Sequence, residues 1–401
     1  MDRLAGDCVF SSLGKMIYGP GKVAEVGNEL DRLGGRRAIL VTGKTLAQSP
    51  LLDSVRKAMG DRCVGVFDGI VQHGAEDSAE VLAAEMRRLD VDSVVSFGGS
   101  SASDTAKVAV AAVLSGRRVE DMATMELFDV VDLGEVTRRI PHVCLPTTLS
   151  AGEYTPGGGA TDREGLKGAV MNPVLQIDVI INDPELSMET SDVLWASTGI
   201  RALDHIVEAF YSQHSQSFTD ALAGKAAELL FEHLPASIRT EGDERIMHRG
   251  HCLTAAWLSN YAAMNTRYGV SHAVGHKMGP MWNVPHGITS CVSLPFAMRF
   301  MAQHYPERFA KLADALKVDF DAADPGSGAA RCIARVEALI DSLGLPRSIS
   351  ALGIPKDEID RVTSHIRYEI DLLDTVGRPV TDAEVSELLA QMYPARNSLA
   401  A

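Results

Sequence analysis

The regular alternation of short apolar runs with helix-like segments in the first half of the chain most constrains its fold. Four runs have the composition expected of strands that are buried on both faces of a parallel sheet: 38–42, 64–67, 91–97 and 142–146. Segments with helical periodicity at 50–59 and 77–89 lie between them. This alternation predicts an α/β domain with a doubly wound parallel sheet, whose ligand lies at the carboxyl ends of the strands.

The pattern changes near Asp183. Beyond it, long periodic segments contain few clusters of β-branched residues, as is typical of helices: 216–233, 246–264 and 303–316. A chain of 401 residues is also long for one hydrophobic core. We therefore expect an α/β domain over residues 1–185 and an all-helical domain over residues 186–401.

A turn of small residues joins the run at 91–97 to an apolar helix at 108–114. Such a turn lets the backbone approach a pyrophosphate, and the helix N-terminus offers free N–H groups and the positive end of its dipole. The turn therefore predicts a dinucleotide site formed by Gly98, Gly99, Ser100 and Ser101. Ser103 and Asp104 are equally well explained as caps of the helix.

Histidines gather in the second half of the chain. His272 and His276 are four residues apart, on one face of a helix, and His286 follows in Pro-His-Gly, while His205 lies on an earlier segment. Imidazole is the commonest metal ligand and the usual acid or base near neutral pH. Histidines satisfied by neighbours in a helical core are the alternative, but their density and the flanking glycines favour a metal site or a proton relay. The pattern predicts an enzyme.

The stretch from Gly269 to Gly287 resembles the signature of the group III, iron-containing alcohol dehydrogenase family, G-x-x-H-x-x-x-H-x-x-G followed by P-H-G. The resemblance implies that His272 and His286 are ligands of a divalent metal. It also implies that His276 lies at the reacting end of the substrate and relays the proton. Two further family ligands come from an Asp-x-x-x-His pair, and here that pair is Arg201-x-x-x-His205.

Arg201 changes what such a site can hold, because arginine stays cationic and cannot ligate a metal. It could replace the metal, by holding a substrate carboxylate or by polarising the carbonyl. Alternatively, Asp204 could supply the missing carboxylate after a local rearrangement, or Arg201 could pair with Asp204 or Glu208 on the helix surface. We expect catalysis by His276, Arg201 and His205, and poor binding of Fe²⁺ or Zn²⁺ by His205, His272 and His286.

The resemblance extends to the first half of the chain. Residues 98–107 are similar to the family's G-G-G-S-x-x-D-x-A-K, and residues 146–152 to its P-T-T-x-x-x-G, whose threonines line the nicotinamide side of the cavity. Lys167 is similar to a family lysine near the cofactor ribose, although a solvated surface lysine explains it equally well. The resemblance implies an NAD(P)H site formed by Gly98, Gly99, Ser100, Ser101, Asp104, Thr147, Thr148, Ser150 and Lys167.

Gly43 and Lys44 follow the first predicted strand. NAD-restricted family members have an aspartate at the position of Gly43, which binds the ribose hydroxyls. A 2′-phosphate would meet no like charge here, and Lys44 could pair with it. We therefore expect NADP(H) to be tolerated, unless Gly43 serves only as a turn residue.

Within the family, residues 66–73 and 146–155 look most like maleylacetate reductases, which reduce an enone diacid. Gly275 departs from them, since those enzymes usually have cysteine there. We expect an NAD(P)H-dependent oxidoreductase that transfers hydride to a carbonyl or an enone acid. A metal-dependent alcohol dehydrogenase, a lyase similar to dehydroquinate synthase, and a binding protein that has lost catalysis are the alternatives.

The net charge of the chain argues against some classes of binding partner. The chain has 53 acidic and 38 basic side chains, a net charge of −15, which argues against nucleic acid or an anionic membrane as a partner. No apolar run approaches the roughly 18 residues of a membrane span, and the first residues do not form a signal peptide. The six scattered cysteines fit reduced thiols. We expect a cytoplasmic enzyme of small molecules, and the resemblance implies a homodimer.

Overall fold

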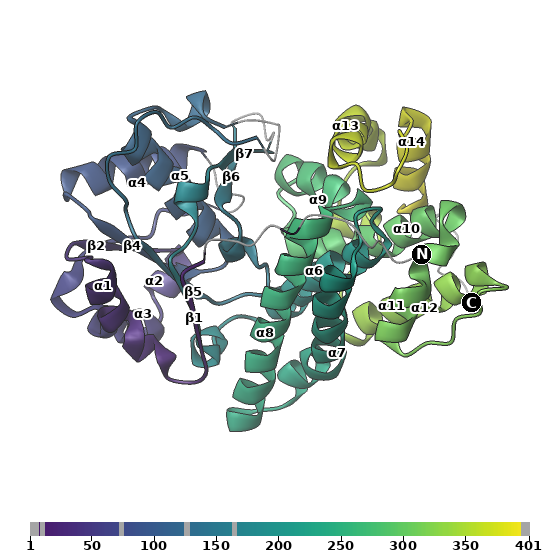
Figure 1. The fold of residues 1–401 in the computed structure, drawn as a ribbon, viewed down its shortest axis with the longest axis horizontal. Helices are drawn as coiled ribbons and strands as arrows, with labels where there is room; N and C mark the ends of the chain where they lie inside the picture. Colours follow the sequence, from purple (N-terminus) through teal and green to yellow (C-terminus); the bar gives the residue numbers. More distant parts are fainter. Residues whose placement is uncertain (1–7, 9–12, 72–75, 124–128, 163–166, 394–401) are drawn as a thin grey trace. The chain divides into compact units, whose positions relative to one another are not determined.

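The computed structural model describes residues 8, 13–71, 76–123, 129–162 and 167–393 (Figure 1). The chain forms two compact units, one of residues 10–191 with 241–253 and one of residues 192–240 and 254–401 with 1–9. The first unit thus continues six residues beyond the predicted boundary at 185 and includes a segment of a later helix. The domain boundary expected at residue 185 therefore stays a prediction.

The first unit contains a six-stranded sheet in which every neighbouring pair of strands is parallel. Its strands, in the spatial order β1-β8-β5-β4-β2-β3, are β1 (Lys15–Tyr18), β8 (Val179–Asn182), β5 (His142–Pro146), β4 (Ser93–Gly98), β2 (Ala38–Thr42) and β3 (Cys63–Phe67). The four strands predicted from apolar runs are confirmed, whereas β1 and β8 were not predicted from the sequence.

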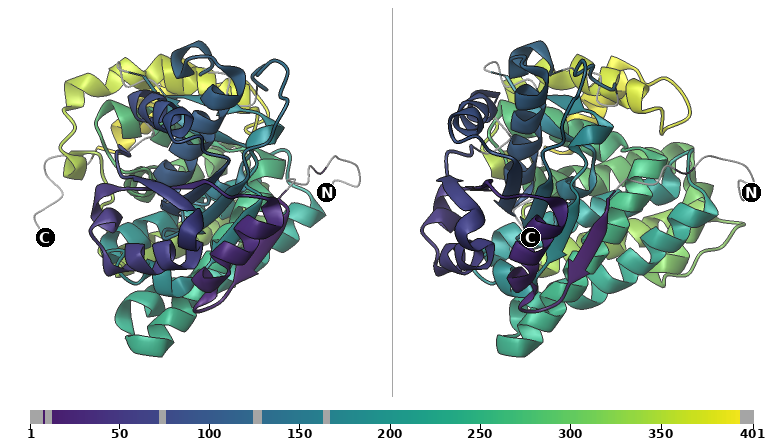
Figure 2. Two further views of the ribbon diagram at one scale, coloured as in Figure 1. Left: turned by 90° about the vertical axis from the view of Figure 1, so that its left-hand side faces the viewer. Right: turned by 60° about the vertical axis from the view of Figure 1, so that its left-hand side comes forward.

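Alternate residues of one strand belong to two separate hydrophobic clusters, which shows that both faces of the sheet are covered. Ile39 and Val41 pack with residues of α4 (Glu76–Arg88) and α5 (Ser100–Ser115). Ala38 and Leu40 pack with residues of α1 (Val26–Leu33) and α3 (Pro50–Met59). Helices on both faces explain why the strands are apolar throughout, and they confirm the doubly wound α/β fold (Figure 2).

An antiparallel pair, β6 (Gly157–Thr161) and β7 (Lys167–Met171), packs on α5 and was not predicted. Its glycines hide any alternation of apolar residues, and they are needed for packing, since a Cβ on Gly158 would lie 2.6 Å from the carbonyl oxygen of Asp104. The remaining short elements of this unit are α2 (Lys44–Ala47) and the 3-10 helices η1 (Lys22–Glu25), η2 (Gly60–Arg62), η3 (Val119–Asp121), η4 (Gly152–Tyr154), η5 (Pro173–Leu175) and η6 (Pro184–Ser187).

The second unit is built from helices; the isolated bridge between Asp321 and Asp324 is the only β pairing among its described residues. Its helices are α6 (Asp192–Tyr211), α7 (Ser217–Arg239), α8 (Gly242–Thr266, whose first half belongs to the first unit), α9 (Val270–Met281), α10 (His286–His304), η7 (Pro306–Phe309), α11 (Ala310–Leu316), α12 (Pro325–Ser342), η8 (Ser350–Leu352), η9 (Lys356–Val362), α13 (Thr363–Leu373) and α14 (Asp382–Gln391).

The predicted helical segments at 216–233 and 246–264 are confirmed by α7 and α8. The expectation of one continuous segment at 303–316 is wrong, because α10 ends at His304 and Pro306 begins a 3-10 helix before α11. Proline lacks the N–H that a continuing helix needs and restricts the residue before it.

Helix α6 is the centre of the second unit. Every residue from Trp195 to Tyr211 is buried, as expected of a helix surrounded by other helices. Gly199 allows α7 to pack closely, since a Cβ there would lie 2.6 Å from the side chain of Leu234. The helices of the described part of the chain include none long and apolar enough to cross a bilayer. Its six cysteines form no disulfide with one another.

Candidate active site

Three helices of the second unit bring together the predicted histidines and Arg201. Arg201 and His205 lie one turn apart on α6, His272 and His276 one turn apart on α9, and His286 begins α10. The ring centroids are 4.9 Å apart for His205 and His272, 6.0 Å for His272 and His276, and 5.9 Å for His276 and His286. The histidine cluster that the spacing of these residues in the sequence predicted is therefore present in the structure.

Glycines of the histidine-rich stretch have a packing role in this cluster. A Cβ on Gly287 would lie 2.5 Å from the backbone of Ser197, so the start of α10 is in direct contact with α6. A Cβ on Gly279 would lie 3.0 Å from Nδ1 of His286, so the absence of a side chain makes room for that imidazole. Both glycines help to place His286 beside α9.

The Arg201 guanidinium lies inside the cluster. Its Nη2 is 3.2 Å from Nε2 of His276, and its Nη1 donates to Oγ of Ser290 at 3.1 Å. The carboxylate of Asp204 is 3.7 Å from Nη1. Only 8% of the Arg201 side chain is exposed, so the interpretation of a pair on the helix surface is wrong, although the pairing with Asp204 is real.

Glu369 of α13 contacts the other side of His276. Its Oε1 is 2.5 Å from Nδ1 of His276, and its Oε2 is 2.8 Å from Nζ of Lys277. Burial raises the pKa of Glu369, but the charges and hydrogen bonds of His276 and Lys277 outweigh it and leave the pKa below its ordinary value. Because Nδ1–H donates to this carboxylate, Nε2 is the nitrogen that accepts from Arg201. Sequence reasoning missed Glu369, which is 93 residues from His276 and belongs to no motif.

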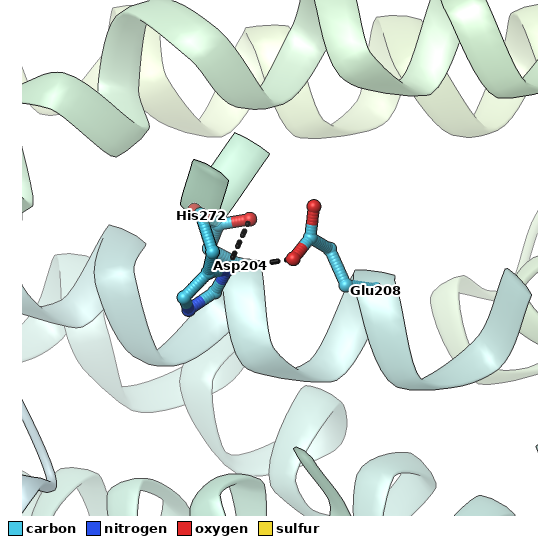
Figure 3. Close-up of side chains that lie close together, drawn as sticks. All are labelled: Asp204, Glu208 and His272. Carbon is cyan, nitrogen blue, oxygen red and sulfur yellow. Dashed lines mark hydrogen bonds and ion pairs between the residues drawn. The ribbon is translucent and has the colours of Figure 1, made fainter. Parts of the chain in front are cut away.

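Asp204, Glu208 and His272 form a second group of polar side chains, which shares His272 with the cluster (Figure 3). Glu208 accepts hydrogen bonds from the backbone N–H groups of Gly269 and Ser271 and from Nδ1 of His272, the last at 2.6 Å. Asp204 accepts from Oγ of Ser271 at 2.8 Å. Burial raises the pKa of Asp204 to about 6, and burial together with the nearby Asp204 raises the pKa of Glu208.

This group caps a helix rather than forming a metal centre. One ligand atom from each of its three side chains lies within 4.8 Å of the others, close enough to hold an ion. However, the oxygens of Glu208 already accept the free N–H groups at the start of α9, which a helix N-terminus must satisfy. The third donor, Nδ1–H of His272, points at the same carboxylate, so that nitrogen has no lone pair for a metal.

The hydrogen bond to Glu208 leaves Nε2 of His272 as an unprotonated nitrogen. Nε2 is buried and has no hydrogen-bond partner among the described residues. The neighbouring His205 stacks on His272, and its Nδ1 lies 3.4 Å from Oγ of Ser259. Burial, and then the charge of Arg201, lower the pKa values of both histidines well below the ordinary value, so both are neutral.

A divalent ion would find three imidazoles here, His205, His272 and His286, but the carboxylates that contact His272 lie at its Nδ1. Asp204 lies on the Nδ1 side of His272, at 3.6 Å, and not on the side of the free Nε2. The fourth ligand position is Arg201, a donor-only cation that adds repulsion. The residues therefore do not fit a tightly held Fe²⁺ or Zn²⁺.

The predicted dinucleotide turn of the first unit has the expected form. Gly98 ends β4 with φ 149°, in the region that favours glycine, and Gly99 precedes α5 without a capping side chain. A Cβ on Gly99 would lie 3.1 Å from Thr148, so the turn is packed against the segment after β5. The uncapped N–H groups that follow, at Ser100 and Ser101, suit an anionic pyrophosphate.

Ser103 and Asp104 are not the caps of α5, because the helix begins at Ser100. Ser103 Oγ donates to the carbonyl of Ser100, and Asp104 accepts from the N–H of Gly159 in β6. Asp104 therefore ties α5 to β6. The explanation of these residues as caps is wrong.

The other predicted cofactor residues lie at the same edge of the sheet or outside the described part. Thr147 donates its N–H to the carbonyl of Gly98 at 3.0 Å, and Oγ1 of Thr148 is 3.1 Å from Oγ of Ser150. Gly43 follows β2 and precedes α2, where Lys44 is exposed. The side chain of Lys167 lies outside the described residues, as do Gln72 and His73 of the segment similar to maleylacetate reductases.

A doubly wound sheet with a glycine turn at its carboxyl edge, together with a helical unit that gathers acid–base side chains, defines a dinucleotide-dependent oxidoreductase. The chain belongs to the iron-containing alcohol dehydrogenase family. The family model described as iron-containing alcohol dehydrogenase matches residues 14–184, and the model of the C-terminal part of the Fe-containing alcohol dehydrogenase family matches residues 195–393. The predicted family and enzyme class are confirmed.

Relatives with different substrates are similar to the chain to the same degree. The NAD-dependent methanol dehydrogenase of Bacillus methanolicus is 28% identical over 379 residues, which are 93% of this chain and 96% of the relative. Maleylacetate reductase 1 of Rhodococcus opacus is 28% identical over 347 residues, 86% of each chain. The crystal structure of a 1,3-propanediol oxidoreductase superposes with a TM-score of 0.86 at 26% identity, covering 96% of this chain and 99% of the other.

Proposed function

We propose that this protein is an NAD(P)H-dependent reductase of a carbonyl or enone acid, similar to maleylacetate reductase, in which Arg201 takes the place of the family's metal ion. The contact between Nη2 of Arg201 and Nε2 of His276 carries this proposal. It places a fixed positive charge and an acid–base group side by side, where a substrate oxygen could contact both.

The nicotinamide, when bound, supplies the hydride. As the carbonyl carbon of the substrate gains the hydride, its oxygen keeps the electron pair of the C=O π bond and becomes negative. Arg201 stabilises that charge, because guanidinium N–H donors in a buried site are stronger than in water. The oxygen then takes a proton from Nε2 of His276. The sum is substrate, NAD(P)H and a proton giving the reduced product and NAD(P)⁺. For an enone acid, hydride adds to the β-carbon of the conjugated C=C and the same oxygen becomes an enolate. That oxygen takes the proton from His276, and the resulting enol tautomerises to the saturated ketone.

His276 must pick up one proton before each reduction, because its Nε2 is the unprotonated nitrogen in the structure. The carboxylate of Glu369 favours the resulting imidazolium, and Arg201 disfavours it. A protonated His276 between these two groups is a ready proton donor. In the direction of alcohol oxidation, the neutral form would accept the proton of the hydroxyl.

An acidic substrate suits the charges of the site. Arg201 is a permanent cation, whereas the charge of the buried Lys277 is already paired with Glu369 at 2.8 Å. Two of the guanidinium nitrogens already contact Ser290 and His276, so we propose that Arg201 polarises the reacting oxygen rather than holding a distant carboxylate in a bidentate pair. The similarity to maleylacetate reductase is consistent with a substrate of this type.

A metal-dependent alcohol dehydrogenase is the second candidate. The observation in its favour is the buried Nε2 of His272, which has a free lone pair and no partner among the described residues. The similarity to methanol dehydrogenase agrees with this candidate. The missing carboxylate and the charge of Arg201 argue against it.

One experiment separates the two candidates. The purified protein is treated with chelator, and oxidation of NADH and NADPH is followed with an enone diacid, its dimethyl ester and simple aldehydes. We expect turnover of the diacid without metal and much weaker turnover of the ester. Turnover of simple aldehydes alone, and only after Fe²⁺ or Zn²⁺ is added, would establish the second candidate instead. Light scattering on the same sample tests the homodimer that the family resemblance implies.

A further inference from the structure

We propose that Glu369 is a positioning residue that fixes the ring and the tautomer of His276, so that Nε2 faces Arg201 and the substrate. The catalytic consequence of this assignment rests on the function proposed above. The assignment of the tautomer itself does not, since it follows from hydrogen bonds within the protein.

Glu369 lies on α13, close to the end of the chain and far in sequence from every motif described above. Its side chain is 2% exposed, and its two oxygens contact two different cationic or acid–base groups. Oε1 is 2.5 Å from Nδ1 of His276 and Oε2 is 2.8 Å from Nζ of Lys277. Lys277 neutralises the carboxylate, so Glu369 is not an isolated buried charge, which would be costly.

The contacts of His276 with Arg201 and Glu369 are compatible with only one neutral tautomer. Arginine has donors and no acceptor, so Nε2 must accept the bond from Arg201. Nδ1 therefore carries the hydrogen and donates it to Glu369. Without Glu369, Nδ1–H would lose its carboxylate acceptor and the ring would be held by Arg201 alone. The ring could then turn away from the guanidinium, and the hydrogen could move to Nε2. That tautomer cannot accept a proton at Nε2.

A purely structural ion pair is the competing explanation, and a set of variants distinguishes the two. Glu369→Gln keeps an acceptor near Nδ1 but leaves Lys277 as an uncompensated buried charge. The double variant Glu369→Leu with Lys277→Met removes the acceptor and both charges, so no buried charge remains unpaired. Arg367→Gln is the matched control on α13, since Arg367 pairs with Asp371 and Asp382 near the surface.

We expect Glu369→Gln to lower the melting temperature and the double variant to recover it. If Glu369 positions His276, the double variant should nevertheless lose kcat by about 10- to 1000-fold, with an unchanged Kd for the cofactor. Arg367→Gln should match the unaltered protein in both. Recovery of both stability and kcat in the double variant would show that Glu369 is only a structural partner and would overturn the proposal.

A second measurement does not need activity. Long-range ¹H–¹⁵N correlation spectra of protein labelled at the histidine side chains distinguish the two neutral tautomers, and His276→Gln identifies the signals of His276. We expect hydrogen on Nδ1 in the unaltered protein and in Arg367→Gln, and a shift towards hydrogen on Nε2 in the double variant. Hydrogen on Nε2 in the unaltered protein would overturn the proposal. The expected tautomer, in a protein that reduces no carbonyl compound, would refute the proposed function while leaving this assignment in place.

Discussion

Nη2 of Arg201 is 3.2 Å from Nε2 of His276, so the positive charge of this site belongs to a side chain that is covalently part of the protein. A metal can be lost or exchanged, whereas a guanidinium is covalently attached and stays charged near neutral pH, although burial lowers the pKa of Arg201. The same charge repels any cation that approaches the three neighbouring imidazoles. In the function proposed above, Arg201 therefore supplies the electrostatic stabilisation that a metal ion would otherwise supply.

The metal content of the protein tests this exchange. We expect the unaltered protein to purify with far less than one Fe²⁺ or Zn²⁺ per chain and to keep its activity in chelator. Arg201→Asp should raise the affinity for Zn²⁺ by at least tenfold, because it removes the repulsion and adds a carboxylate. It should also impair turnover of an acidic substrate. Metal analysis after dialysis, and titration with a zinc indicator, measure both effects.

Arg201→Gln is the matched control, since it removes the charge without supplying an anionic ligand. Its zinc affinity should fall between those of the unaltered protein and Arg201→Asp. Stoichiometric, tightly bound metal in the unaltered protein, with activity lost on its removal, would contradict the account of Arg201.

Substitution of His276 should affect chemistry and not cofactor binding. We expect His276→Ala to lower the rate of the chemical step by about 10² to 10⁴, the usual contribution of a positioned acid or base. Fluorescence titration should give an unchanged Kd for NADH. Single-turnover kinetics measure the chemical step directly, and near-normal rates in that experiment would exclude His276 as the proton relay.

Local patterns were sufficient for the sheet and for most of the histidine cluster. The apolar runs could be read as strands because both faces of a parallel sheet are buried, and the spacing of His272 and His276 on one helix was visible directly. Strands β6 and β7 left no comparable signal, because three consecutive glycines, 157–159, carry no side chains that could alternate. The helix break after His304 does have a signal in the sequence, because Pro306 cannot continue the helix.

The side chains that hydrogen-bond to the histidine cluster could not be predicted in the same way. Glu369 and Glu208 contact residues 93 and 61 to 64 positions away, and those contacts depend on how whole helices pack. In the sequence, Glu208 and Glu369 look the same as the many other glutamates on helical segments. The burial of their side chains distinguishes Glu208 and Glu369 from the other glutamates. On a helix that is buried nearly all round, such as α6, a buried charged residue leaves no periodic pattern of apolar and polar residues in the sequence.

Glu208 should matter for stability rather than for metal binding. In Glu208→Gln an amide N–H₂ replaces one oxygen that accepts the N–H groups of α9, so a buried donor is left unsatisfied. We expect a loss of about 2–4 kcal/mol in the free energy of unfolding, measured by urea denaturation. Glu228→Gln, which breaks an exposed pair with Lys225 at 2.7 Å, is the control and should leave the free energy of unfolding nearly unchanged. Equal effects of the two variants would refute the capping role.

The buried Glu153 should make stability depend on pH. Burial raises its pKa from 4.5 to about 7, although Lys107 acts in the opposite direction. The folded protein binds this proton more tightly than the unfolded chain, so the stabilisation is complete below pH 4.5 and is lost as the pH rises through 7. The loss is on the order of 3 kcal/mol. Glu153→Gln should therefore melt at a higher temperature than the unaltered protein at pH 8, and the difference should shrink at pH 5. A difference that is the same at both pH values would contradict this.

The cofactor preference should depend on Gly43. Its backbone is extended, with φ −89° and ψ 160°, and a Cβ there would meet no atom within 4 Å, so an aspartate fits without strain. We expect the unaltered protein to bind NADPH within about tenfold of NADH, or 1.4 kcal/mol. Gly43→Asp should weaken NADPH by at least tenfold through repulsion of the 2′-phosphate and leave NADH unaffected. Lys44→Gln should weaken NADPH alone, by a smaller factor, because it removes the cation proposed to pair with that phosphate. Fluorescence titration measures the affinities of the three proteins for both cofactors, and a preference for NADH above a hundredfold in the unaltered protein would show that Gly43 is only a turn residue.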